Sequence, residues 1–139
     1  MRGVSLLIRL AQHDLEERRS DLGCISRAQT ETESAIGALD QSVTSEMSIA
    51  MVDSTAVTAF GAWARQSARG RTALENRSRE LHQSAVAARE NLRETAAQVR
   101  RLEIALETDR EKARRLSVRR ADAKADEREL VRYTGVTSH

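Results

Sequence analysis

The side chains that could act as catalytic acids, nucleophiles or metal ligands are few and far apart in this sequence. The histidines are His13, His82 and His139, and the single cysteine is Cys24. No Cys/His metal spacing and no glycine-rich phosphate loop occurs. We therefore predict that the chain is not an enzyme and uses no metal or cofactor. We interpret the histidines as exposed helix residues and Cys24 as a small residue beside a hydrophobic seam.

The arginines form two series that a nucleic acid or an acidic protein would attract. One series lies at residues 65–79, and the other contains the pairs at 100–101, 114–115 and 119–120. Lys and Arg (23) nearly balance Asp and Glu (21), which gives a net charge of +2. Nucleic-acid binding favours a continuous basic stripe with stacking aromatics, whereas acidic residues interrupt the second series and aromatics are absent from it. We predict no nucleic-acid partner, and an acidic protein surface is the better match.

Two of the rare aromatic residues, Phe60 and Trp63, are three positions apart and so share one side of a predicted helix. Two interpretations remain open. They form a hydrophobic plug at one end of the fold, or they are an exposed anchor for a partner, because tryptophan is enriched among interface hot spots.

The elements that must position these residues are helices. The chain has no proline, 2% aromatic and 32% charged residues, a composition typical of coiled coils. No apolar stretch approaches the roughly 18 residues of a membrane span. The apolar run at residues 4–8 is followed at once by charges, so we do not interpret it as a secretory signal.

A heptad grid fits most of the sequence. Counting Ile8 as position a, all later a positions up to Ala50 are apolar except Gln29, while the d positions include Arg18, Thr32 and Glu46. In the second half, a and d positions carry mainly leucine, valine and alanine from Leu74 onward. We call the a and d positions of residues 4–106 the seam. Such a repeat, sustained over many heptads, predicts a coiled coil.

The apolar pattern fades at about residues 44–58, where Ser, Thr and Asp favour turns and caps. We predict an all-α fold, a long antiparallel two-helix coiled-coil hairpin forming a single domain over residues 1–139. Helix one spans about 4–51, the bend 52–56, with Asp53 or Ser54 as N-cap, helix two 57–131 and a frayed tail 132–139. The heptad phase passes through the bend unchanged, so a continuous helix in a parallel dimer that acts as a structural scaffold is the alternative.

The sequence also resembles the flagellar export protein FliJ and the related YscO-like stalk family of type III secretion. The resemblance lies in the segment at residues 5–10, the charged run at 16–19, the aromatic pair Phe60 and Trp63 with the basic stretch after it, and residues 126–128. It implies a non-enzymatic coupling stalk similar to the central shaft of rotary ATPases. Such a protein is cytoplasmic, serves flagellum biogenesis and motility or a virulence secretion system, and meets the inner-membrane export apparatus only through its partners.

The resemblance implies two main partners, a hexameric export ATPase and the cytoplasmic domain of the export gate, with export chaperones as a further candidate. Position by position, Phe60, Trp63 and Ser67 correspond to the gate-contacting residues, although family members often carry Leu where this chain has Ser67. The candidates for contact with the ATPase ring are basic: Arg18, Arg19, Arg114, Arg115, Arg119 and Arg120.

Overall fold

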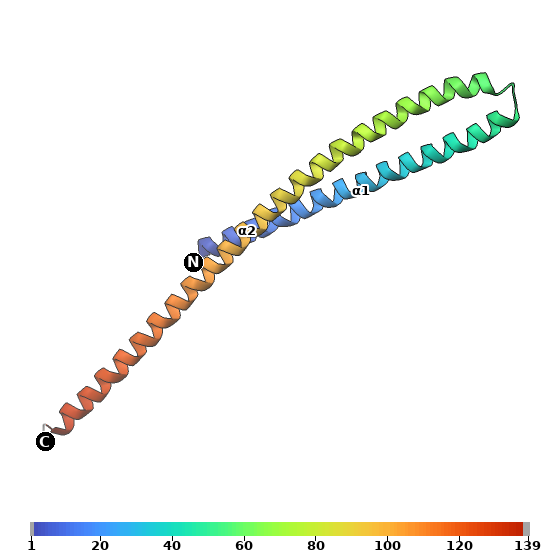
Figure 1. The fold of residues 1–139 in the computed structure, drawn as a ribbon. Helices are drawn as coiled ribbons and strands as arrows, with labels where there is room; N and C mark the ends of the chain where they lie inside the picture. Colours follow the sequence, from blue (N-terminus) through green and yellow to red (C-terminus); the bar gives the residue numbers. More distant parts are fainter. Residues whose placement is uncertain (1, 138–139) are drawn as a thin grey trace. The chain divides into compact units, whose positions relative to one another are not determined.

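A computed structural model describes residues 2–137, and their only regular elements are two α-helices (Figure 1). Helix α1 spans Arg2–Val52 and α2 spans Val57–Thr137. The helices pack against each other in antiparallel directions, which confirms the predicted all-α hairpin. The continuous helix of the alternative interpretation is not formed, because residues 53–56 turn the chain back.

Side-chain burial follows the heptad grid closely. Every seam position of α1 up to Val43 is buried or half-buried, and so is every seam position of α2 from Phe60 to Leu106. The most buried apolar side chains are small or medium in size, which fits a narrow seam: Ile8, Ala50, Leu81, Ala85 and Val99. Among the residues whose burial is described, three are both buried and polar, namely Thr32, Ser67 and Thr95. Thr32 and Thr95 each donate a hydroxyl hydrogen bond to the carbonyl four residues earlier, so neither is buried unsatisfied.

The turn between the helices is built by Asp53. Its Oδ1 accepts hydrogen bonds from the backbone N–H of Thr55 (3.0 Å) and from the Thr55 hydroxyl (2.8 Å). This local Asx-type arrangement makes a tight turn without glycine or proline. The prediction that Asp53 or Ser54 caps the second helix is wrong. Helix α2 begins at Val57, so the capping position is Ala56, whose carbonyl accepts the first helical bond from Phe60 N–H at 2.8 Å.

At its other end α2 continues through Thr137, six residues beyond the predicted end at 131. The segment has no proline to stop it, and the Thr134 hydroxyl donates to the carbonyls of Leu130 and Val131, both at 3.0 Å. Residues 138 and 139 lie outside the described residues.

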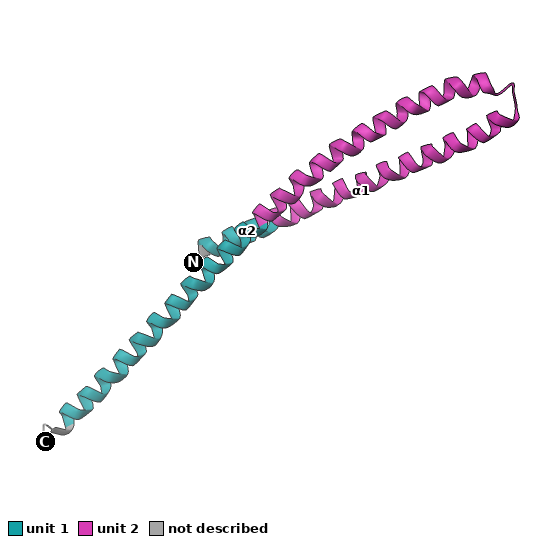
Figure 2. Cartoon of the chain, viewed as in Figure 1, with its two compact units in different colours: residues 1–13, 96–139 teal, residues 14–95 magenta. Residues whose placement is uncertain are grey.

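The chain divides into two units (Figure 2). Unit 2 comprises residues 14–95 and contains the hairpin turn. Unit 1 combines residues up to 13 with those from 96 onward. In this unit the start of α1 packs on the middle of α2. Within the described residues, neither helix is long and apolar enough to cross a bilayer.

Candidate protein-binding surfaces

The turn end of unit 2 carries an exposed apolar surface. Met47, Ile49, Met51, Val52 and Val57 are all exposed, with Met51 and Val52 at 83% and 90%. We call these five residues, together with Phe60 and Trp63, the tip surface. All five lie near the turn, and exposed large apolar side chains are candidates for contact with a partner.

Phe60 and Trp63 form the more buried part of the tip surface. Their ring centroids are 6.1 Å apart with the ring planes tilted by 39°, a spacing in the range of favourable aromatic pairs. Both residues are half-buried and line a hollow with residues of both helices and the turn: Glu46, Ile49, Ala50, Ala56 and Ala59. The pair therefore closes the seam on one side and remains accessible on the other, so it has features of both the plug and the anchor interpretations.

Ser67 does not share this surface. It is 8% exposed and occupies a seam position one heptad beyond Phe60, facing α1. A partner at the tip could contact Phe60 and Trp63 without separating the helices, but it could not reach Ser67.

The electrostatics of the turn are set by Asp53. The hydrogen bonds from Thr55, first from its hydroxyl and then from its backbone N–H, hold the pKa of the Asp53 carboxyl below its ordinary value of 3.8. Asp53 is thus a fixed negative charge at neutral pH beside the apolar residues Met51 and Val52. A partner for the tip surface must accommodate that charge at its edge.

Unit 1 carries a second surface, the part of α2 that we call the extension, residues 112–135. Every residue of the extension is exposed. Its first nine residues contain five basic side chains and no acidic one: Lys112, Arg114, Arg115, Arg119 and Arg120. Arg114 and Arg115 both contact Glu111, at 2.7 and 3.4 Å. The predicted ring-contacting arginines of this segment are therefore exposed along one helix.

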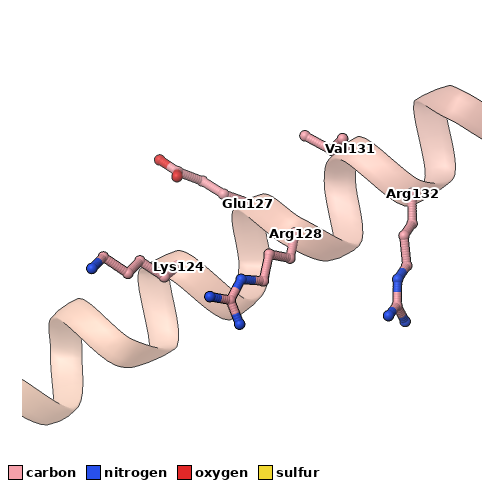
Figure 3. A pocket seen from close by; sticks show the side chains of 5 residues that line it. All are labelled: Lys124, Glu127, Arg128, Val131 and Arg132. Atoms are coloured by element: carbon pink, nitrogen blue, oxygen red, sulfur yellow. The ribbon is translucent and has the colours of Figure 1, made fainter.

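Farther along the extension, shallow hollows lie on the helix surface. Figure 3 shows one of them, lined by Lys124, Glu127, Arg128, Val131 and Arg132. Glu127 and Val131 project to one side, and Arg128 and Arg132 project together to another (Figure 3). A hollow formed by a single helix is a shape that a side chain of another helix fills, rather than an enclosed site for a small molecule.

Arg18 and Arg19, the other predicted ring contacts, belong to unit 2. Arg18 is a half-buried seam residue whose Nε lies 3.5 Å from Asp14 Oδ1, and Arg19 is exposed and donates to Glu16 at 2.7 Å. The structure therefore does not gather the six arginines into one unit.

The remaining reactive groups are dispersed. His13 and His82 are exposed, as predicted, and His139 lies outside the described residues. Cys24 is exposed, and Arg27 Nη2 donates to its sulfur at 3.3 Å. Among the described residues, no three His, Cys, Asp or Glu side chains come together in a way that could hold a metal ion.

Sequence reasoning missed most of the tip surface. The signal was present, because Met47, Ile49, Met51 and Val52 are apolar yet fall off the a and d positions. A similar signal marks Leu6, Leu7 and Leu10 in unit 1, which are 53–58% exposed. Large apolar residues off the grid lie beside or outside a two-helix seam, so much of their surface faces solvent or a partner.

Fold and surfaces together define an antiparallel two-helix coiled-coil hairpin with exposed candidate binding surfaces in both units. No family model, no curated protein and no solved structure matches the chain. The resemblance to the export stalk family therefore stays a prediction that rests on the residues quoted for it.

Proposed function

We propose that this chain is a non-enzymatic coupling stalk of a flagellar or related type III export apparatus, and that it binds the hexameric export ATPase and the export gate. The observation that carries the proposal is the extension of unit 1. It is a helical segment exposed throughout, with a basic first half, adjoining the segment of α2 that packs on α1. A helix of this kind suits insertion into a ring whose inner surface is acidic.

The tip surface supports the second contact of the proposed stalk. Its exposed methionines and valines lie at the same end of the hairpin as the half-buried aromatic pair, and apolar and aromatic side chains of this kind are common contacts in protein interfaces. The stalk would bind the gate through Phe60 and Trp63, with Met51 and Val52 as additional contacts. Because Ser67 is buried, it has no role in this proposal.

The ring contact is tested with the full chain and purified export ATPase hexamer. We expect co-sedimentation at low salt and faster ATP hydrolysis. Arg119→Gln/Arg120→Gln should weaken both effects several-fold, since both side chains are exposed on the extension. The matched control is Arg100→Gln/Arg101→Gln, which removes the same charge from exposed positions of α2 elsewhere in unit 1. Failure to bind the hexamer, or equal losses in the two variants, would contradict the ring contact.

The gate contact is tested separately with the cytoplasmic domain of the gate. Met51→Ser/Val52→Ser should weaken binding several-fold without unfolding the hairpin, because both side chains are almost fully exposed. Val86→Ser is the control, since Val86 is an exposed apolar residue of α2 in the same unit but outside the tip surface. If the double variant binds the gate domain as well as the unaltered chain does, the tip surface is not the contact.

A further inference from the structure

The extension continues the heptad pattern beyond the point where α1 covers α2. We propose that it pairs with the extension of a second copy of this chain, as an antiparallel two-helix coiled coil. The inference rests on residues of unit 1 alone and does not depend on the proposed function. If the pairing and the proposed ring contact both hold, pairing covers Arg119 and Arg120, so a second copy and the ring compete for one surface.

An exposed apolar stripe runs along the extension. Ala113, Leu116, Ala123 and Leu130 continue the a and d positions in unbroken phase, and the two leucines are 52% and 66% exposed. Residues Ala113, Leu116, Ser117 and Arg120 line a hollow on this stripe. These four residues occupy positions a, d, e and the next a. In a coiled coil, four such positions form the hole that receives a side chain of the facing helix.

The two halves of the extension differ in charge. Every charged side chain in residues 112–120 is basic, whereas residues 122–129 contain four acidic and two basic side chains. Pairing in antiparallel orientation about the middle of the extension places the basic half of each copy against the acidic half of the other. Charge complementarity of this kind selects the orientation of coiled-coil helices.

One antiparallel register places the charged a positions of the extension opposite apolar d positions. In an antiparallel pair an a position faces a d position, which is also how α1 and α2 align. With Ala113 facing Leu130 of the second copy, Arg120 faces Ala123 and Glu127 faces Leu116. The flanking Arg119 then lies beside Asp126 of the second copy, and symmetry repeats the contact. A parallel in-register pair would instead bring Arg120 against Arg120 and Glu127 against Glu127, and like charges at the seam oppose pairing.

Sedimentation equilibrium of the full chain tests the pairing over a range of protein and salt concentrations. We expect the mass to rise from the monomer value of 15.5 kDa toward twice that value with concentration, and to fall back as salt screens the charges. Leu116→Ser should abolish the rise. Val118→Ser is the matched control, because Val118 is 58% exposed two residues away but lies outside the stripe. A chain that stays monomeric at all concentrations, or equal effects of the two variants, overturns the proposal.

Charge exchange tests the register. Arg119→Asp and Asp126→Arg should each weaken self-association about tenfold or more, and the double variant should restore it because the pair is re-formed with reversed signs. Restoration supports the antiparallel register. A double variant that is weaker than either single variant overturns it.

A distance measurement tests the orientation. In a Cys24→Ser background, a spin label at Thr108→Cys should lie about 40 Å from its counterpart in the antiparallel pair, at 1.5 Å per residue from the centre of symmetry. In a parallel pair the two labels would be about 10 Å apart, the width of the coiled coil. The short distance would overturn the proposal and favour a parallel scaffold.

Discussion

The ion pair between Asp40 and Arg71 joins the two helices of unit 2 across 31 positions of sequence, and it allows a quantitative test of the hairpin. Arg71 Nε lies 3.0 Å from Asp40 Oδ1, and Arg71 Nη2 lies 3.2 Å from Oδ2. The two bonds form a bidentate guanidinium–carboxylate pair, the strongest geometry for such a contact. Arg71 also donates to Glu75 at 3.2 Å on its own helix, which holds the guanidinium in place.

The expected coupling energy is modest because the pair is partly solvated. The side chains of Arg71 and Asp40 are 41% and 50% exposed. Exposed pairs contribute about 0.2–1 kcal/mol, and the bidentate geometry places this one at about 0.5–1 kcal/mol. The pair between Arg77 and Glu80 is the control, since it lies within one helix, has a single contact at 3.9 Å and is more exposed. Its coupling should be about 0.3 kcal/mol or less.

The assay is a double-mutant cycle of Asp40→Asn and Arg71→Gln. The free energy of unfolding of each variant is measured by urea titration with helical circular dichroism. The coupling should fall toward zero in 1 M salt. A coupling below about 0.2 kcal/mol at low salt, or one equal to that of the control pair, would refute the inference that this bidentate ion pair joins α1 to α2 in the hairpin.

Three further predictions use the same unfolding assay or a titration. Thr32→Val should raise the free energy of unfolding by about 0.5 kcal/mol, because it replaces a buried hydroxyl by a methyl group. Thr30→Val is the control and should change the free energy of unfolding little, since Thr30 is exposed but makes the same type of hydroxyl-to-carbonyl bond. Equal effects of the two substitutions would contradict the placement of Thr32 in the seam. Gly37→Ala should stabilise α1 by about 0.5–1 kcal/mol, since nothing lies within 4 Å of the added Cβ. A variant with a lower Tm than the unaltered chain would contradict a helix that is exposed at residue 37. The pKa of Asp53 is lowered by folding, so its stabilising effect is present above pH 3.8 and is lost as the pH falls through the lowered pKa. Thr55→Val removes the hydroxyl donor but keeps the N–H, so an NMR titration should show the pKa of Asp53 moving part of the way back, and an unchanged pKa would contradict the turn geometry.

The fold was largely predictable because one physical constraint dominates it. In a two-helix coiled coil each a and d position faces the partner helix, so a repeat of seven in the sequence translates directly into burial. Even the polar exceptions Arg18, Gln29 and Thr32 are buried or half-buried, as the grid requires. The bend was located from Ser, Thr and Asp alone, since no glycine or proline marks it.

The surfaces were less predictable because they depend on what lies off the grid. Glu46 is a seam position by spacing but is exposed, whereas Ile49, off the seam, lines the hollow beside Trp63. Near the turn the helices end, and the path of the backbone determines which side chains come into contact there, in place of the heptad position. Asp53 shows the same effect, because its carboxylate bonds locally to Thr55 rather than to the first turn of α2. Position in the repeat therefore predicts burial where the two helices pack along their length, and its exceptions, Glu46, Asp53 and Val57, lie near the turn.

The extension gives the clearest physical reason for expecting a partner. A helix with no tertiary packing is marginal in water, because nucleation is unfavourable and most helical stability in proteins comes from burying an apolar face. Between residues 112 and 135 no such face is covered, and Leu116 and Leu130 remain more than half exposed. Any helix that covers the stripe, whether from a second copy or from an ATPase ring, stabilises this segment while it binds. Covering the stripe should thus slow amide hydrogen exchange across the whole extension, and exchange that stays fast in the bound state would show that binding occurs elsewhere.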